Sequence, residues 1–278
     1  MKITIWGCRG SLPSPGLEKN KYGGNTSCVQ VQDGQKGFII DGGSGILRLG
    51  THFDESIKEF DILLTHLHLD HIMGLGYFKP LYDPSVTVNI WGPSSSSESL
   101  SKRLKQYFSP PLFPVRLNEL RANIVFKEIG NDTFSIGNFE IQSEYVCHPG
   151  PTVGYRCRLG HKVFTFLPDH EPALGSSKFP HLKNWSSGYN LAHDADLLFH
   201  DGQYTADEYI KRIGWGHSSM EDAIKFGEMA KVKKLVFFHY DPVRSDFELE
   251  QMLLNCTKDK EISFDLKLGR ENEVFYIE

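Results

Sequence analysis

The stretch LLTHLHLDHIMG, residues 63–74, places four side chains that commonly bind metals within six positions. His66 and His68 are two residues apart, so in an extended chain they project to the same side and can bind one cation. Asp70 and His71 follow directly and can reach a second cation. Imidazole nitrogen suits zinc, iron or manganese, whereas a carboxylate suits harder cations. The stretch therefore predicts a site for two metal ions rather than an ordinary polar loop.

The apolar run Asp61–Thr65 in front of this stretch is typical of a strand that is covered on both faces. His148, Asp169 and His239 each follow a further predicted strand, within residues 138–146, 162–167 and 234–238. Active sites in α/β proteins favour the carboxyl ends of strands, so these three residues are candidates for the same site. Taken singly, a His or Asp at the end of a strand usually has a structural role, and these three are candidates because they occur together.

The bulk composition is that of an ordinary globular chain of 278 residues, with 40% hydrophobic and 23% charged residues. A net charge of −5 argues against a general nucleic-acid coat protein. No apolar segment is long enough to cross a bilayer, so no membrane partner is expected. Five scattered cysteines without a CxxC pair favour reduced thiols in the cytoplasm. With no long linker and no repeat, residues 1–278 are predicted to form a single α/β domain.

The segment THLHLDH resembles the His-x-His-x-Asp-His signature of the metallo-β-lactamase superfamily, and His148, Asp169 and His239 follow in the order of that family. The resemblance covers nearly the whole chain. It implies a four-layer αββα sandwich and two divalent metal ions, with zinc expected and manganese or iron as alternatives. It also implies the ligands, which are His66, His68 and His148 for the first metal, Asp70, His71 and His239 for the second, and Asp169 as a bridge.

The segment GWGHSSMEDAIKFGEMAKVKKLVFFHYDP, residues 214–242, resembles the ribonuclease Z and cyclic-phosphodiesterase branch of the superfamily. In that branch a histidine that is not a ligand opens a helix, and His217 stands there, before a capping box that begins at Ser218. GPTVGYR at residues 150–156 is also similar to that branch. Flavodiiron proteins have Glu in place of His68, and most β-lactamases lack the bridging Asp. Glyoxalase II-type enzymes append a helical region, whereas the residues after His239 are predicted as strand and loop.

Two departures from ribonuclease Z bear on the substrate. The tRNA-gripping arm of that enzyme is inserted where this chain runs directly from Arg156 to the Lys162 strand. Its Pro-x-Lys-x-Arg-Asn loop is not intact in LPSPGLEKNKYGGNTS, residues 12–27. We therefore expect a small phosphodiester, a cyclic nucleotide above all, and do not expect tRNA as a partner. A homodimer is left open.

The expected reaction is phosphodiester hydrolysis by a hydroxide that bridges the two metals, which lie about 3.5–4 Å apart in such sites. Asp70 and Asp169 are expected to take part by holding the metals, and His217 by donating a proton to the leaving oxygen. A merely local hydrogen-bonding role for His217 is the competing interpretation. An acyl hydrolase, either a lactonase or a thioesterase, is the alternative enzyme, and a binding module without chemistry is a third hypothesis.

Several other residues have two interpretations. Residues 94–121 include aromatic and basic side chains that could cover the cleft, or the aromatics, Phe108 above all, could pack the helix onto the domain. His200 and Asp201 are expected to support a ligand by hydrogen bonding. Asp41, in DGGSG, is expected to shape the backbone rather than to bind metal.

Overall fold

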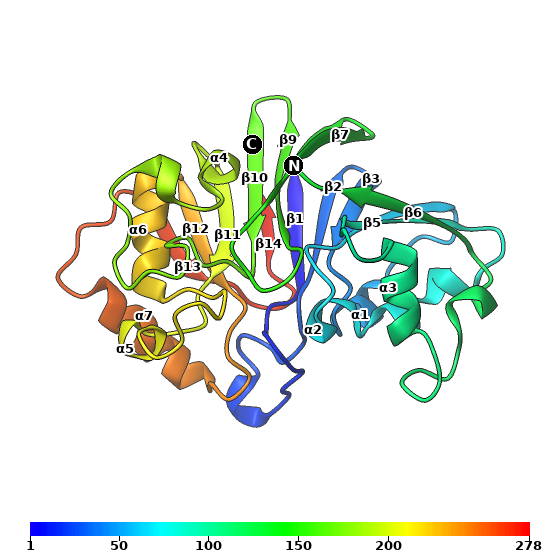
Figure 1. Ribbon diagram of the computed structural model, residues 1–278, viewed down its shortest axis with the longest axis horizontal. Coiled ribbons are helices and arrows are strands. Elements are labelled where there is room, and N and C mark those ends of the chain that lie inside the picture. The colour runs from blue at the N-terminus through cyan, green and yellow to red at the C-terminus, as the bar shows by residue number, and fades with distance from the viewer.

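The computed structural model describes residues 1–278 as two seven-stranded β-sheets packed face to face, with helices on both outer surfaces (Figure 1). The first sheet has the order β14 (Val274–Tyr276), β1 (Lys2–Gly7), β2 (Cys28–Asp33), β3 (Lys36–Ile40), β4 (Glu59–Leu63), β5 (Thr87–Pro93) and β6 (Asn123–Ile129). The second has the order β13 (Asp265–Leu268), β12 (Lys234–Phe238), β11 (Leu197–Asp201), β10 (Lys162–Leu167), β9 (Val153–Leu159), β8 (Phe139–Tyr145) and β7 (Asp132–Ile136).

The helices divide between the two outer surfaces. Helices α1 (Ile46–Leu49), α2 (Leu69–Ile72) and α3 (Leu100–Tyr107) lie beside the first sheet, on the right of Figure 1. Helices α4 (Tyr189–Ala192), α5 (Ala206–Tyr209), α6 (Met220–Ala230) and α7 (Asp246–Thr257) lie beside the second, on the left. The predicted four-layer αββα architecture is confirmed.

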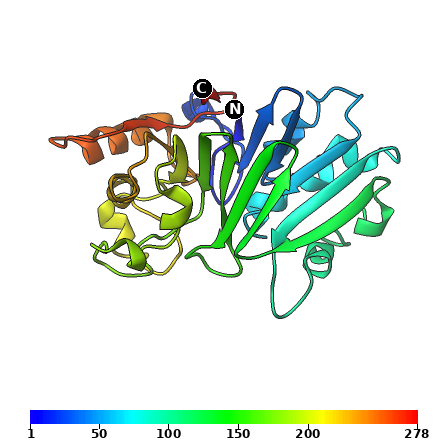
Figure 2. The same cartoon turned by 90° about the horizontal axis from the view of Figure 1, so that it is seen from above.

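Parallel pairing brings the ends of several strands to one edge of the sandwich. Strands β3 to β6 are parallel to one another in the first sheet, and β10 to β13 are parallel in the second. Each carboxyl end releases a loop, and the segments after β4, β8, β10 and β12 carry the predicted ligands. Strand β1 pairs with β14, which keeps the two chain ends together at the opposite edge (Figure 2).

Two apolar clusters hold the layers together. The larger has 44 buried residues, taken from the facing surfaces of both sheets and from the helices of the second. The smaller has 22 and lies between the first sheet and its helices. Leu100, Leu104 and Phe108 are at most 1% exposed in the smaller cluster, so this stripe of α3 packs onto the sheet. Packing is therefore the correct interpretation for Phe108.

Three helix boundaries differ from the sequence-based expectation. The cap of α6 is Ser219, whose hydroxyl accepts a hydrogen bond from Asp222 N, whereas the expected cap Ser218 donates its hydroxyl to the carbonyl of His170. The stretch TADEYIKRIG, residues 205–214, predicts a helix from the Thr205 capping box to Gly214, but helix α5 ends at Tyr209. The segment after His239, expected as strand and loop, contains the 12-residue helix α7.

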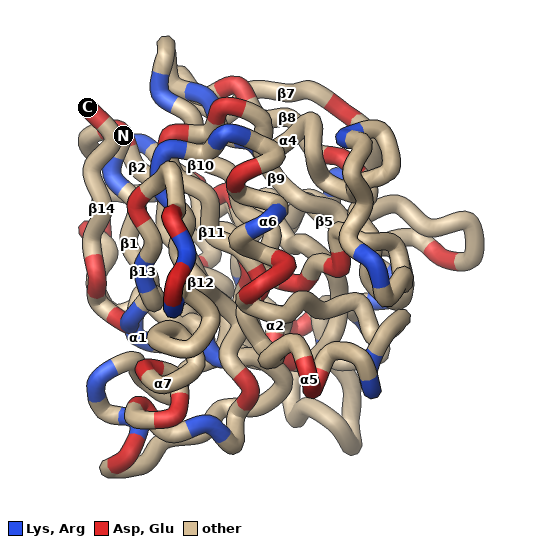
Figure 3. The backbone as a smooth tube through the Cα atoms, turned by 90° about the vertical axis from the view of Figure 1, so that its left-hand side faces the viewer, with Lys and Arg blue, Asp and Glu red and all other residues tan.

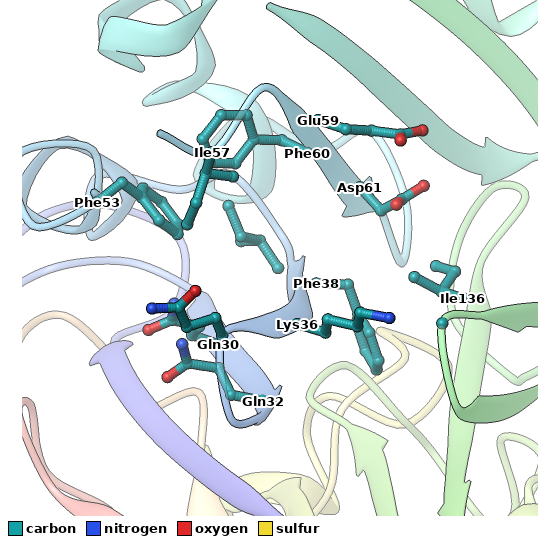
Figure 4. Close-up of a pocket in the computed structure, with 14 residues that line it drawn as sticks. Gln30, Gln32, Lys36, Phe38, Phe53, Ile57, Glu59, Phe60, Asp61 and Ile136 are labelled. Atoms are coloured by element: carbon teal, nitrogen blue, oxygen red, sulfur yellow. The ribbon is translucent and has the colours of Figure 1, made fainter. Parts of the chain in front are cut away.

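Acidic and basic residues are interspersed over the face that carries α6 and α7 (Figure 3). A cavity of about 380 Å³ opens where β3 and β4, which pair only at Ile39–Ile62 and Ile40–Leu63, diverge at their amino ends. Lys36, Glu59 and Asp61 line it, and none of the predicted ligands does (Figure 4). None of the helices combines the length and the apolar character that crossing a membrane requires.

Candidate metal centre

The loop that leaves β4 changes from extended chain to helix within the histidine-rich stretch. His68 is the N-cap of α2 with extended backbone angles (φ −64°, ψ 152°), and Asp70 and His71 lie in the first turn of that helix. His66, Asp70 and His71 are buried, whereas His68 is exposed. His66 and His68 form one candidate group with His148, and Asp70 and His71 form another with His239, although His66 also lies beside His71, with ring centroids 4.2 Å apart.

Three side chains from the second sheet meet this loop. His148 comes from the segment after β8, Asp169 from the segment after β10, and His239 directly follows β12. His148 Nε2 lies 3.1 Å from His68 Nδ1. His239 Nε2 lies 3.0 Å from Asp70 Oδ2 and 3.2 Å from Asp169 Oδ1. Residues separated by up to 169 positions along the chain thus form one cluster between the sheets.

The seven predicted ligands divide into overlapping groups. Within each group the nitrogen or oxygen atoms lie within 4.8 Å of one another, and the groups are His66 with His68 and His148, Asp70 with His71 and His239, and Asp169 with His66 and His71. Ligand atoms around a tetrahedral zinc, at bond lengths of about 2.0–2.2 Å, lie roughly 3.3–3.6 Å apart. Distances across the cluster, such as 3.3 Å between His71 Nε2 and Asp70 Oδ2 and 3.8 Å between His148 Nε2 and Asp169 Oδ1, are close to this spacing, so the cluster fits divalent cations.

Unpaired polar atoms in the cluster agree with this fit. His66 Nε2 is buried and forms no hydrogen bond, and the buried atoms His71 Nε2 and Asp169 Oδ2 lie 3.1 Å apart but without hydrogen-bond geometry. Buried polar atoms nearly always have a partner, because leaving one unpaired costs free energy. A cation is the partner that two imidazole nitrogens and a carboxylate oxygen share. The donor set thus fits the metals that the sequence predicts.

Hydrogen bonds to the opposite ring nitrogens fix two of the imidazoles. His71 Nδ1 donates to Asp41 Oδ2 at 2.7 Å, and His148 Nδ1 donates to the carbonyl oxygen of Gly216 at 2.8 Å. Such partners set the tautomer and leave Nε2 free for a metal. Asp41 also accepts from Thr65 N at 2.9 Å, so it shapes the backbone as expected and in addition orients His71.

Charges within the cluster favour a cation. Burial lowers the pKa of His66 well below its usual value, and it lowers the pKa of His148 to about 4 against the pull of Asp169. Burial acts in the same direction on His239, but Asp169 and Asp70 outweigh it and raise the pKa to about 9. Burial would raise the pKa of Asp169, yet the surrounding imidazoles, His239 first, hold it well below its usual value. The carboxylates therefore remain ionised and attract positive charge.

His217 lies at the edge of the cluster, with a side chain that is 13% exposed. Its Nδ1 donates to Asp201 Oδ2 at 2.7 Å, and its ring stacks on that of His239 with centroids 5.1 Å apart. Asp201 was expected to support a metal ligand, and the structure shows that it orients His217 instead. His200 pairs with His170 at 2.9 Å in the core, so neither of them reaches the cluster.

Two further elements of the site were not predicted from the sequence. Ser11 N donates to Asp70 Oδ2 at 2.7 Å, and a Cβ at Gly10 would lie 2.4 Å from the ring of His239. Glu171, which is fully buried, accepts hydrogen bonds from Gly214 N and Gly216 N beside His217. In the sequence, only the glycines at positions 10, 214 and 216 indicate that something lies close to the backbone there. A glycine alone does not show which residue that is.

A cavity of about 460 Å³ adjoins the cluster. One wall is formed by His66, His68 and the adjoining leucines, and the other by α3 and the Ser97–Glu98 segment before it. Arg103, Gln106 and Tyr107 face it from α3. The segment 94–121 therefore has both predicted roles, since its apolar stripe packs on the sheet while its other face lines the cavity.

Comparison with known proteins agrees with this geometry. A family profile described as "Beta-lactamase superfamily domain" matches residues 39–240. A ribonuclease Z from Nanoarchaeum equitans is 27% identical, over 95% of this chain and 91% of its own length. Human tRNase Z, short form, has a similar fold, with a TM-score of 0.62, 17% identity and complete coverage of both chains. A diphosphatase of the PhnP family gives a TM-score of 0.66 at 17% identity, with 100% of this chain and 98% of that chain covered.

These relatives correct one expectation. The absence of an inserted arm between Arg156 and Lys162 led to the prediction that tRNA is not a partner. That prediction is wrong, because similar proteins along most of the chain bear the name ribonuclease Z. The lack of one arm does not identify the substrate, since RNA can be bound through other surfaces.

The family assignment rests on the fold, the cluster and the matching profile together. Two β-sheets lie between helices, and the ordered His and Asp motifs meet at the carboxyl ends of the strands. The profile covers more than half of the chain. The chain therefore belongs to the β-lactamase superfamily and is a metal-dependent hydrolase with the metallo-β-lactamase fold.

Proposed function

We propose that this hydrolase is a phosphodiesterase that uses two metal ions. In this proposal His66, His68 and His148 hold the first metal, Asp70, His71 and His239 hold the second, and Asp169 bridges them. The convergence of these side chains, with buried and unpaired atoms among them, is the observation that carries the proposal. Zinc is the proposed metal because imidazole nitrogen predominates among the ligands, with manganese or iron as alternatives.

The metals and the protein contribute different parts of the chemistry. When bound, two such metals activate water as a nucleophile and neutralise charge on the phosphoryl oxygens. His217 supplies the remaining proton. Because its Nδ1–H is engaged by Asp201, Nε2 is the atom that would carry the proton for the leaving oxygen. General acid catalysis of this kind is typically worth about 10²–10⁴-fold.

A small cyclic phosphodiester, such as a cyclic nucleotide, is the first candidate substrate. The cavity of about 460 Å³ beside His66 and His68 is of a size that accommodates a small organic group. Exposed Leu69 and Leu112 and the ring of Tyr107 offer apolar and aromatic surface for a base. Arg103 is the basic side chain in its lining and can interact with a polar base edge or a phosphate.

RNA is the second candidate, and the observation that favours it is the name of the relatives. Ribonuclease Z proteins match between 73% and 99% of this chain at 22–27% identity. RNA and cyclic nucleotides share the reacting group, a phosphodiester with an alkoxide leaving group. The two candidates therefore need the same metals and the same proton donor, and differ in what surrounds the phosphate.

The experiment compares three phosphodiesters and two acyl substrates with one protein. Protein stripped with a chelator and reloaded with zinc or manganese is incubated with 3′,5′-cyclic AMP, with a tRNA transcript carrying a 3′ extension, and with bis(p-nitrophenyl) phosphate. Turnover of any of them that requires metal supports the phosphodiesterase, and the ratio of cyclic nucleotide to RNA turnover identifies the substrate class. A lactone and a thioester are included, because the fold also suits acyl hydrolysis.

A matched pair of variants serves as the control. His66→Ala removes a predicted ligand and is expected to abolish turnover, whereas His161→Ala alters an exposed histidine in the turn between β9 and β10 and is expected to leave it unchanged. If the metal-loaded protein cleaves only the lactone or the thioester, the acyl hydrolase replaces the phosphodiesterase as its function.

We also propose that residues 1–278 form one hydrolase domain in a reducing compartment such as the cytoplasm. The larger apolar cluster includes residues from Met1 to Phe275, which supports one folding unit. All five cysteines are free thiols, which supports a reducing environment.

A further inference from the structure

Glu171 is a carboxylate that the proposed reaction does not use, although it lies two residues from Asp169. It is 0% exposed. Its oxygens accept hydrogen bonds from the hydroxyl of Tyr209 at 2.7 Å, from Gly214 N at 2.9 Å and from Gly216 N at 2.9 Å. All of these donors are neutral. A buried carboxylate is costly unless its oxygens are satisfied, so this arrangement has a specific task in the fold.

Both backbone donors belong to the loop that leads to His217. Gly214 and Gly216 have positive φ angles, +84° and +82°, which are unfavourable for residues with a side chain. The loop also packs tightly against His148, since a Cβ at Gly216 would lie 2.5 Å from His148 Nδ1. The carbonyl oxygen of the same glycine accepts the hydrogen bond from His148 Nδ1 at 2.8 Å. One loop therefore contacts a predicted metal ligand and carries the predicted proton donor.

We propose that Glu171 is a positioning residue that holds this loop, so that Gly216 orients His148 and His217 faces the leaving oxygen. The proposal rests on the function proposed above. The backbone amide of Glu171 supports the same arrangement by donating to the carbonyl of Cys147 at 3.0 Å, next to His148. Ser218, directly after His217, donates to the carbonyl of His170, so residues 170 and 171 hold the loop at two points.

The loop needs two acceptor oxygens at position 171, one for Gly214 N and one for Gly216 N. A glutamine at position 171 keeps the size of the side chain but replaces one acceptor oxygen by an NH₂ donor. In place of Oε2 that donor would face Gly216 N, which then has no partner. In place of Oε1 it would face Gly214 N, which then keeps only its 3.1 Å contact with the other oxygen. An unpaired buried amide is destabilising. The loop is expected to shift locally while the rest of the fold remains. Proton donation by His217 and the orientation of His148 should both become less accurate.

The test uses Glu171→Gln in the full-length, metal-saturated protein with two leaving groups. The alkoxide of 3′,5′-cyclic AMP needs a proton, whereas the p-nitrophenolate of bis(p-nitrophenyl) phosphate leaves readily without one. We expect kcat for the cyclic nucleotide to fall about 10–100-fold, and kcat for the aryl ester to change by less than about threefold. KM should change little for either substrate, because Glu171 does not line the cavity.

Zinc affinity, measured by competition with a chromophoric chelator, is a second readout that needs no turnover. Loss of accurate support for His148 should weaken zinc binding about 10–100-fold. Glu273→Gln is the matched control, since Glu273 is a buried carboxylate paired with Lys267 near β14, away from the cluster. Tyr209→Phe removes one donor to Glu171 and should act in the same direction as Glu171→Gln but less strongly. It serves in place of Glu171→Gln if that variant does not fold.

Two results would overturn the proposal. One is an equal loss on both substrates at saturating metal, which indicates general damage to the fold, and the other is no loss on either. If the unmodified protein hydrolyses neither phosphodiester, the proposed function fails and zinc affinity alone decides the role of Glu171. Unchanged zinc affinity in Glu171→Gln would then reject it.

Discussion

Two imidazoles of the metal centre have a neighbour that fixes one ring nitrogen and leaves the other for a metal. Asp41 does this for His71 and the Gly216 carbonyl for His148, at 2.7 and 2.8 Å. Asp201 fixes His217 in the same way, at 2.7 Å. The orientation of these rings therefore depends on residues outside the predicted set of ligands.

Asp41→Asn tests this dependence at the second metal. The amide presents a weaker acceptor to His71 Nδ1 and reduces the basicity of the ring. We expect zinc affinity to fall about 10–100-fold, as measured by competition with a chelator. Asp54→Asn, which changes an exposed aspartate, is the control and should bind zinc normally. Equal affinities in both variants would show that His71 does not depend on Asp41.

His217→Ala tests the proton donor. Turnover of a substrate with an alkoxide leaving group should fall by about 10²–10⁴-fold, because the leaving oxygen then departs without a proton. Turnover of bis(p-nitrophenyl) phosphate should fall much less. Steady-state kinetics at saturating metal provides both values. A similar loss on both substrates would assign His217 to metal binding or to structure instead.

Among single residues, the sequence predicted the side chains that form the cluster but not Glu171 and Ser11, which hydrogen-bond to its surroundings. Four of the seven side chains that meet lie within six consecutive positions, and the other three end predicted strands. Glu171 and Ser11 escaped prediction because their partners are 43–59 residues away along the chain. Only the folded backbone brings such pairs together, and neither residue belongs to a local pattern.

Among the elements, α6 is the one that connects His217 to the strand carrying His239. It begins directly after Ser219, whose hydroxyl accepts from Asp222 N at 3.0 Å, and its buried side includes Ala223, Phe226 and Ala230. The adjacent Ser218 has a different task, since it joins the His217 loop to His170. The helix cap and the contact that holds the His217 loop are thus made by adjacent residues.

Ser219→Ala should remove the cap of α6. We expect the free energy of unfolding to fall by about 1 kcal/mol, with little change in kcat, because the cap stabilises the helix without contacting the cluster. Unfolding by urea gives the first value and steady-state kinetics the second. Ser177→Ala, an exposed serine outside helices and strands, should change neither. Full stability of Ser219→Ala would mean that the cap contributes nothing.

Strands were predictable from local sequence because apolar runs mark them. A helix boundary was ambiguous where two neighbouring residues are equally good caps. Strands such as β4, β10 and β12 are apolar runs and were predicted within about two residues. Ser218 and Ser219 are both good caps with an acidic residue three positions later, so the sequence could not choose between them. Helix α7 was missed although Ser245 and Glu248 form a capping box that is readable in the sequence.

At the scale of the whole molecule, the metals would connect the two sheets. The loop after β4 carries predicted ligands from the first sheet, and the segments after β8, β10 and β12 carry predicted ligands from the second. The sequence indicated the two strand-rich halves, and the family resemblance supplied the way in which they face each other. Neither composition nor periodicity contains that information, because the packing of two sheets depends on tertiary contacts.

Metal removal should therefore destabilise the whole fold. Metal present at about 1,000 times its dissociation constant stabilises the native state by about 4 kcal/mol. For a chain of this size that corresponds to roughly 10 °C in Tm. Thermal unfolding with and without a chelator measures the difference. An unchanged Tm, in protein that has demonstrably lost its metal, would contradict a role for metals in joining the sheets.

We propose that seven converging side chains hold two metals that together hydrolyse a phosphodiester. Stepwise addition of zinc to the stripped protein, with bis(p-nitrophenyl) phosphate hydrolysis followed at each step, tests it most directly. If both metals are needed, we expect activity to rise until two equivalents of zinc per chain are bound and then to remain constant. Activity that is complete at one equivalent, or two bound equivalents without hydrolysis of the phosphodiester, would contradict it.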